Sequence, residues 1–241
     1  ITNGKIEARV SQHGWIRFIE TSSGGLLLEE VYSLPDWALY PQARSFTAVG
    51  GDLYRVEARF MAYEGEHLYG LGQHRHGFLD QKGCVVELFQ RNAEVCIPFL
   101  VSSRGYGLLW NNPAVGRVEL GYNGTRWVAE GTRQLDYYVT AGDSFTEIME
   151  HYADATGHPP MLPEWAAGFW QCKLRYRTRD ELLSVAREYK RRGLPLSVIV
   201  VDFFHWTRLG EWAWDLEAWP DPTGMVKELE EMGVHLMVSV W

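Results

Sequence analysis

The spacing of the hydrophobic residues follows one pattern up to about residue 144 and another after it, and this change limits the folds that the chain can adopt. Before this point, short alternating or apolar runs are separated by Gly, Asn, Pro and Ser, a pattern typical of antiparallel strands in a sandwich or barrel. After it, apolar runs alternate with segments of helical spacing, as in parallel α/β folds. The sequence therefore predicts two domains of different class.

The first part is expected to be an N-terminal β-sandwich domain over residues 1–143. A helical and Pro-rich linker over 144–163 follows, because Phe145, Ile148 and Tyr152 recur at helical spacing and the prolines of Gly157–Trp165 cannot continue a helix. The strands are expected at nine runs: residues 5–10, 15–20, 53–60, 84–89, 97–103, 105–111, 117–122, 126–131 and 135–140.

The remainder, residues 164–241, follows the order strand, helix, strand, helix, strand, with strands expected at 166–172, 196–202 and 234–241. A capping-box pattern at Thr178–Glu181 begins the first helix, and Asp221 with Pro222 begins the second. Such βαβαβ units form parallel sheets with right-handed crossovers.

A closed (β/α)8 barrel takes roughly 250 residues, so we expect an incomplete TIM barrel of about three parallel strands and two helices. The chain is then a piece of a longer protein. The isolated chain is expected to aggregate or to be molten in its C-terminal third, and to hydrolyse nothing.

The composition excludes several classes of function. A net charge of −8 without a basic stripe argues against nucleic acid, and no apolar stretch approaches the length of a membrane span. Three cysteines without CxxC spacing predict neither a disulfide framework nor a zinc site. The expected ligand is a neutral molecule. The compartment is left open, because the chain begins at Ile1 without a Met. Of the possible compartments, the cytoplasm is favoured.

Two motifs are considered and set aside. Gly70-Leu71-Gly72 would need its third glycine at Arg75 and has no following helix, so a dinucleotide site is rejected in favour of a turn and strand. His74 and His76 would share one face of a strand, but no third ligand lies near them. No metal is therefore expected.

Asp202 ends the apolar run Val198–Val201, at a strand end where α/β folds bind their ligands. One interpretation is a structural acid that caps a helix or pairs with a buried Arg. The other is a ligand group, since indole faces stack on sugar rings while sugar hydroxyls donate to a carboxylate. Core packing remains the alternative for each single Trp. The surrounding aromatic residues are Phe203, Phe204, Trp206, Trp212, Trp214 and Trp219, with Trp170 and Trp241 on the neighbouring strands.

With these residues, the chain resembles glycoside hydrolase family 31, the α-glucosidases and α-xylosidases. The resemblance covers essentially the whole chain. In the first part it rests on YGLGQ (69–73), IPFLVSSRGYGLLWNN (97–112) and DYYVTAGDS (136–144); in the second it rests on LPEWAAGFWQCK, RYRTRDEL, VIVVDFFHW, GEWAWD and WPDP.

The resemblance implies a retaining mechanism with an Asp nucleophile and an Asp acid/base on later barrel strands, beyond this chain, so no catalytic residue is assigned here. It implies that Asp202 accepts hydrogen bonds from hydroxyls of the terminal sugar. It also implies a pocket lined by Phe203, Phe204, His205 and Trp212, with Trp241 at its floor or wall. No cofactor is implied. The expected partner is an oligosaccharide or α-glycoside substrate, and a homo-oligomer is left open.

The expected activity is an exo-acting α-xylosidase. Bulky side chains at Phe203 and Phe204 leave no room for the hydroxymethyl group that glucose has and xylose lacks, and strand alternation predicts that only one of the two rings faces the sugar. The alternatives are an α-glucosidase of the same family and a non-catalytic carbohydrate-binding relative that lost the catalytic carboxylates.

Overall fold

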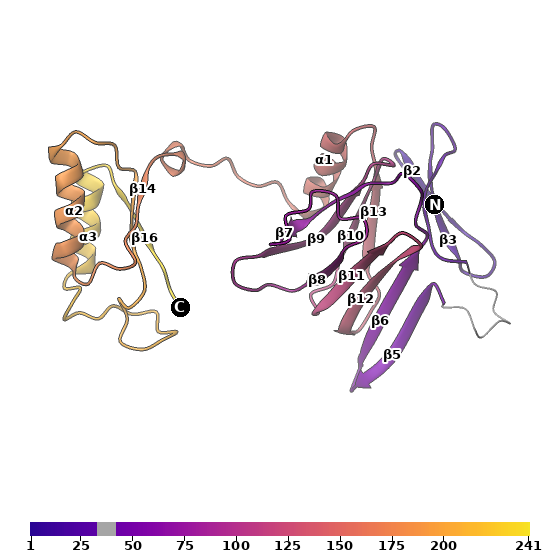
Figure 1. Cartoon of the computed structure of the whole chain (residues 1–241), viewed down its shortest axis with the longest axis horizontal. Coiled ribbons are helices and arrows are strands. Elements are labelled where there is room, and N and C mark those ends of the chain that lie inside the picture. Colours follow the sequence, from indigo (N-terminus) through magenta and orange to yellow (C-terminus); the bar gives the residue numbers. More distant parts are fainter. Residues whose placement is uncertain (33–41) are drawn as a thin grey trace. The chain divides into compact units, whose positions relative to one another are not determined.

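The computed structural model describes residues 1–32 and 42–241, which form two compact units, Ile1–Pro159 and Pro160–Trp241. The first unit is built of strands and one helix, and the second is a small α/β unit (Figure 1). Among the described residues, every helix is too short or too polar to cross a bilayer.

The first unit contains three antiparallel sheets. Their strand orders are β1-β2-β3-β4, β13-β10-β9-β7 and β5-β6-β12-β11-β8. The strands are β1 (Thr2–Asn3), β2 (Ile6–Val10), β3 (Ile16–Glu20), β4 (Leu26–Glu29), β5 (Arg44–Gly50), β6 (Leu53–Phe60), β7 (Leu68–Gln73), β8 (Val85–Leu88), β9 (Val95–Ser102), β10 (Tyr106–Trp110), β11 (Gly116–Gly121), β12 (Gly124–Thr132) and β13 (Tyr137–Ala141).

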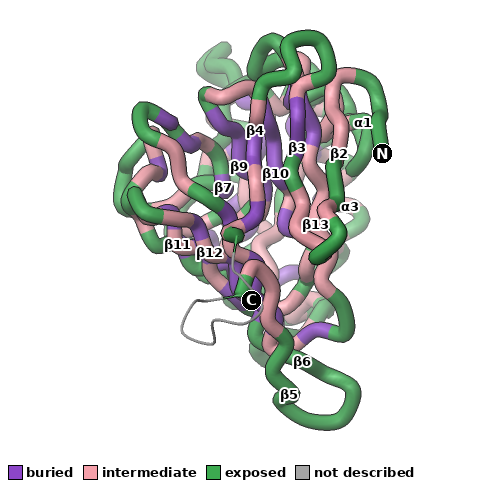
Figure 2. The backbone as a smooth tube through the Cα atoms, turned by 90° about the vertical axis from the view of Figure 1, so that its right-hand side faces the viewer, coloured by how far each residue is buried: buried purple, intermediate pink, exposed green. Residues whose placement is uncertain are grey.

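One hydrophobic core joins these sheets, because alternate residues of each strand point inward. On β6, for example, Val56, Ala58 and Phe60 are buried completely, and Trp110 packs on Trp127 with ring centroids 5.9 Å apart. The buried segments of Figure 2 follow the strands that enclose this core. All nine strands expected from the sequence are present. Four strands lie outside those nine runs: β1 is very short, β4 is a run of three leucines and a glutamate without alternation, β5 is mostly exposed, and β7 was expected only as a turn and strand at Gly70–Gly72.

The segment Tyr69–Gln73 lies in β7 and confirms the turn-and-strand interpretation. Its pairing with β9 is irregular between Gly70 and Gly72. At Gly72, a Cβ atom would lie 2.0 Å from the carbonyl oxygen of Val95, so only glycine permits the close approach of the two strands. This motif is therefore a packing device of the sandwich.

The helix α1 (Phe145–Thr156) belongs to the first unit. The Ser144 hydroxyl accepts from the N–H of Glu147 and caps its N-terminus. Ile148 is completely buried against Phe99, and the ring of Tyr152 stacks on Phe99 at 4.1 Å. The helix thus covers the β13-β10-β9-β7 sheet.

The second unit has the strand order β14-β15-β16, all parallel, with β14 (Trp170–Gln171), β15 (Val198–Val201) and β16 (His235–Val238). The helices α2 (Arg179–Arg191) and α3 (Pro222–Glu231) begin at Thr178 and Asp221, as expected. Both helices lie on the same face of the sheet (Figure 1), the arrangement of a (β/α)8 barrel.

The strand expected over 166–172 is wrong in extent. The 3-10 helix η1 (Glu164–Ala167) occupies its start, because the N–H of Ala166 donates to the carbonyl of Pro163, and only Trp170 and Gln171 pair with β15. The capping box is also modified, since the Glu181 carboxylate accepts from the N–H of Arg177 instead of Thr178.

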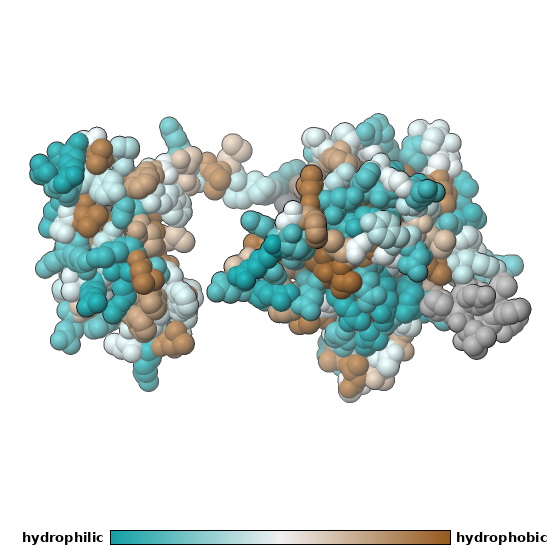
Figure 3. Space-filling view, viewed as in Figure 1, coloured by the Kyte–Doolittle hydropathy of each residue, from teal (hydrophilic) through white to brown (hydrophobic). Residues whose placement is uncertain are grey.

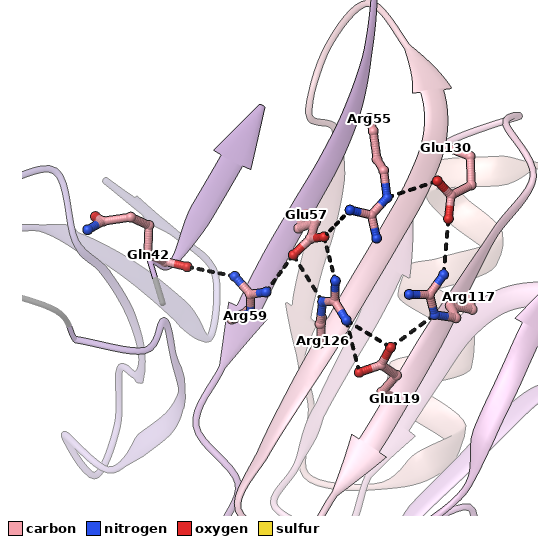
Figure 4. A network of polar contacts seen from close by, with 8 residues as sticks. All are labelled: Gln42, Arg55, Glu57, Arg59, Arg117, Glu119, Arg126 and Glu130. Carbon is pink, nitrogen blue, oxygen red and sulfur yellow. Dashed lines mark hydrogen bonds and ion pairs between the residues drawn. The ribbon is translucent and has the colours of Figure 1, made fainter. Parts of the chain in front are cut away.

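The outer face of the β5-β6-β12-β11-β8 sheet carries a network of charged side chains (Figure 4). Glu57 lies at its centre: its side chain is 5% exposed and its carboxylate accepts from Arg55, Arg59 and Arg126 at 2.5–2.7 Å. Hydrogen bonds from Arg126, together with the charges of the three guanidinium groups, hold the pKa of the Glu57 carboxyl below its ordinary value. The network therefore satisfies a charge that would otherwise be costly to bury.

Replacing Glu57 by Gln leaves three guanidinium groups without the negative charge that they share and with one acceptor oxygen instead of two. We expect E57Q to lower the free energy of unfolding by about 3–5 kcal/mol at pH 7 in urea denaturation. The matched control is E130Q, whose side chain is 43% exposed, with an expected loss of about 1 kcal/mol or less. Because the folded-state pKa of Glu57 is depressed, the stability that its carboxylate contributes is lost as the pH falls through that pKa. The free energies of unfolding of wild type and E57Q should therefore converge in acid. Equal losses in both variants would contradict this account.

Candidate functional site

Parallel pairing brings the C-terminal ends of β14 and β15 together. Gln171 pairs with Ile199, so Cys172 follows one strand and Asp202 the next, at the same edge of the sheet. The Cys172 thiol lies 3.7 Å from Oδ2 of Asp202, while Oδ1 accepts from the N–H of Phe203 at 2.8 Å. Within the described residues, Asp202 neither caps a helix nor pairs with a cation. This geometry favours a ligand group over the structural acid.

Phe203 and Phe204 lie beyond the end of β15, and the backbone there is no longer extended. Phe204 has a φ of 66°, and its ring packs on that of Phe203 with centroids 4.5 Å apart. Strand alternation therefore does not apply to these two residues, and that only one of the rings faces a sugar stays a prediction. Phe203 is half-buried and lies 5.4 Å from the ring of Trp241, whereas Phe204 is 52% exposed.

His205 is buried against two indole rings, at 4.7 Å from Trp206 and 4.9 Å from Trp214. Burial lowers the pKa of its imidazole, so the ring is neutral at pH 7. Its Nδ1 is buried and has no hydrogen-bond partner among the described residues. His205 lines a cavity of about 420 Å³ together with Trp212, Ala213, Trp214, Val238 and Val240.

A second cavity, of about 290 Å³, is lined by Phe203 and the loop after β14: Lys173, Leu174, Arg175 and Arg177. The six expected site residues are therefore divided. His205 and Trp212 line the larger cavity, and Phe203 lines the smaller one and contacts Trp241. Phe204 and Asp202 line neither.

The tryptophan residues of this unit fall into a buried group and an exposed group. Trp206 and Trp219 are buried in the core, which confirms the packing interpretation for them, while Trp212 is 87% and Trp241 59% exposed. Hydrophobic residues also lie among hydrophilic ones on the visible surface of this unit (Figure 3).

Cys172 and the basic loop Lys173–Arg177 also belong to this site, although neither is among the residues expected from the sequence. The alternation of Lys173, Arg175 and Arg177 was visible in the sequence, but the contact between Cys172 and Asp202 depends on the register of two strands.

His74 and His76 stack on each other at 5.8 Å, and Nε2 of His74 donates to the carbonyl of Leu71. Residues 1–32 and 42–241 contain no group of three His, Cys, Asp or Glu side chains arranged for a metal ion.

Burial raises the pKa of the Cys172 thiol, and the adjacent Asp202 carboxylate raises it further through its charge and the S–H hydrogen bond. We therefore expect D202N to react faster than wild type with iodoacetamide at pH 8, because the thiolate is the reactive form. Mass spectrometry of the Cys172 peptide measures the rate, and the half-buried Cys84 serves as the internal control. An unchanged rate at Cys172 would contradict the contact.

Two family models match the chain. The model described as "Glycosyl hydrolases family 31 TIM-barrel domain" matches residues 159–241, and the one described as "Glycosyl hydrolase 31 N-terminal galactose mutarotase-like domain" matches residues 19–119. The two matches correspond to the parallel α/β unit and to the sandwich.

Several relatives are similar over much or all of the chain. "Uncharacterized family 31 glucosidase ORF2" of Pseudescherichia vulneris is 48% identical over 100% of the chain, which covers 48% of that protein. An "Alpha-xylosidase" of Saccharolobus solfataricus is 42% identical over 78% of the chain, which covers 27% of it. The crystal structure of a family 31 α-xylosidase from a soil metagenome, complexed with xylose, is 50% identical and superposes with a TM-score of 0.92 over 100% of this chain and 37% of that one. The chain thus spans about half or less of the length of these proteins.

Proposed function

Because this chain belongs to glycoside hydrolase family 31, we propose that the whole protein is a retaining, exo-acting α-xylosidase that removes terminal α-linked xylose from oligosaccharides or glycosides. The observation that carries the proposal is the half-buried Asp202 carboxylate, which has no cationic partner among the described residues and lies beside exposed aromatic rings. Such a combination suits a neutral sugar, whose hydroxyls donate to the acid while its C–H faces stack on the rings.

Each site residue has a proposed role. Oδ2 of Asp202 accepts a hydrogen bond from a hydroxyl of the terminal sugar, since Oδ1 is already held by the backbone of Phe203. Phe203 and Trp241 form an aromatic wall, and Phe204 supports Phe203 from the outside. The neutral His205 lines the cavity together with Trp212 and contributes an uncharged wall.

The bond-breaking step is proposed to use two carboxyl groups outside this chain. In a retaining glycosidase one carboxylate forms the glycosyl-enzyme, while the other protonates the leaving oxygen and then activates water. Asp202 belongs to neither role, and its contribution is to hold the sugar while its C1 reacts. The chemistry as proposed needs no cofactor.

The domain boundaries are also part of the proposal. We assign the sandwich domain to 1–143, the linker to 144–163 and the barrel segment to 164–241. Oligosaccharides and α-glycosides are the proposed partners.

An α-glucosidase is the second candidate, because "Alpha-glucosidase 2" of Bacillus thermoamyloliquefaciens is 26% identical over 75% of the chain. Xylose is preferred here because the Phe203 ring fills space beside Asp202. A carbohydrate-binding relative without activity is the third candidate, and it is separated from both enzymes by assaying the whole protein on an aryl α-xyloside and on the matched α-glucoside.

The role of Asp202 is tested by D202A in the whole protein. Loss of a charge-assisted hydrogen bond should weaken binding of the transition state by about 2–4 kcal/mol. This lowers kcat/KM on an aryl α-xyloside roughly 30- to 1,000-fold. The melting temperature should change little, because the carboxylate is only half-buried. A variant that unfolds while its folded fraction keeps normal kcat/KM would return Asp202 to the structural interpretation.

Substrate choice is tested with matched aryl α-xyloside and α-glucoside. We expect wild type to prefer the xyloside by roughly ten- to a thousandfold in kcat/KM, because the glucose hydroxymethyl would be buried unpaired. F203A should narrow this ratio mainly by admitting glucose. F204A is the matched control, since its ring is more exposed and lines neither cavity. Equal wild-type rates on the two substrates would favour the α-glucosidase.

A further inference from the structure

The smaller cavity beside Asp202 is basic, although the chain as a whole is acidic. Three of its five lining residues are Lys173, Arg175 and Arg177, in a protein with a net charge of −8. Leu174 and Phe203 provide apolar surface in the same cavity of about 290 Å³. A concave site that combines apolar surface with a few convergent charged groups is typical of ligand recognition.

Two of these cations have no anionic partner. Neither the Arg175 nor the Arg177 guanidinium forms an ion pair with any residue of the described ranges, whereas Arg187, Arg191, Arg192 and Arg208 in the same unit are each paired with a glutamate. Of the three, only Lys173 forms an ion pair among the described residues, because its Nζ lies 2.7 Å from Oε1 of Glu181. The pKa of the Glu181 carboxyl is lowered by the backbone N–H of Arg177, by this ion pair and, to a smaller extent, by the charge of Arg177. The cavity therefore keeps an excess of positive charge.

Arg175 is also held in place. Its guanidinium carbon lies 5.1 Å from the centre of the Phe204 ring, and Phe204 in turn packs on Phe203. Stacking of this kind restrains the guanidinium plane and leaves its N–H edges free to donate two parallel hydrogen bonds to a carboxylate.

The cavity is adjacent to the proposed sugar position. Lys173 directly follows Cys172, whose thiol contacts Asp202, and Phe203 directly follows Asp202 while lining the cavity. The cavity is thus joined to Asp202 through two neighbours in the chain, Lys173 by way of Cys172 and Phe203 directly.

We propose that this basic cavity binds an anionic group of the substrate, in first place a carboxylate, so that the whole protein acts preferentially on acidic glycosides. The inference rests on the proposed glycosidase function and names its substrate class. We place the carboxylate on the leaving group, because the proposed preference for xylose leaves no room for a substituent on C5 of the terminal sugar. A carboxylate recognised on the terminal sugar would instead overturn that preference.

The test compares kcat/KM for 4-carboxyphenyl and 4-carbamoylphenyl α-xyloside, which differ in charge, with the whole protein. A third substrate, the 4-carbamoylphenyl α-glucuronide, carries its carboxylate on the sugar. In R175Q, we expect kcat/KM for the 4-carboxyphenyl xyloside to fall about three- to thirtyfold relative to kcat/KM for the neutral xyloside. The fall should be larger in R175Q/R177Q. Taking the ratio of anionic to neutral substrate in each variant cancels differences between the leaving groups.

The control variant is R191Q, near the C-terminal end of α2, where Arg191 pairs with Glu188. It should leave the anionic-to-neutral ratio at the wild-type value. The wild-type ratio should also fall as NaCl is raised, because exposed charges are screened. This behaviour of the 4-carboxyphenyl xyloside supports the inference, whereas the same behaviour of the glucuronide overturns the placement on the leaving group and the preference for xylose.

Ratios that are the same in wild type, R175Q and R175Q/R177Q overturn the inference, while hydrolysis of the neutral xyloside leaves the proposed function standing. If no substrate is hydrolysed, the proposed function fails. The inference is then decided by calorimetric titration with the same three compounds, where equal affinities in wild type and R175Q/R177Q overturn it.

Discussion

The parallel pairing of β14, β15 and β16 is the constraint on which the candidate site depends. Trp170 pairs with Val198, and Val198 with His235, so three strand ends from distant parts of the sequence meet at one edge. Cys172, Asp202 and Trp241 follow those ends. Hydrogen bonds of the ladder, buried on one face by α2 and α3, set this register, and a shift of one residue would move Asp202 away from the thiol.

The Glu57 carboxylate of the first unit and the Asp202 carboxylate of the second differ in how fully their oxygens are hydrogen-bonded and paired with cations. In the sandwich, Glu57 is surrounded by three guanidinium groups, which compensate its charge and leave it no capacity for a ligand. In the α/β unit, Asp202 has one oxygen held by the backbone and the other beside a weak thiol donor. An incompletely satisfied carboxylate gains more from a sugar hydroxyl than a saturated one does, because the hydrogen bond it forms replaces only water or a weak partner.

The same reasoning separates the two cavities next to Asp202. The larger one, with His205 and Trp212, is lined by aromatic and aliphatic side chains and a neutral imidazole, which suits an uncharged sugar. The smaller one presents two unpaired guanidinium groups. Phe203, which lines the smaller cavity, contacts Trp241 near the end of the chain.

The sequence by itself determined the class of each unit, the parallel order of the last strands, the helix caps at Thr178 and Asp221, and the position of Asp202 at a strand end, because hydrophobic period and capping chemistry are local properties. Only the tertiary structure decided that β14 shortens to two residues, that Phe204 leaves the extended conformation, and that Arg175 stacks on it. Each of these depends on contacts between residues far apart in the chain. No local pattern encodes which strand end will lie beside which loop, so the division of the site into a neutral and a basic cavity was not readable from the sequence.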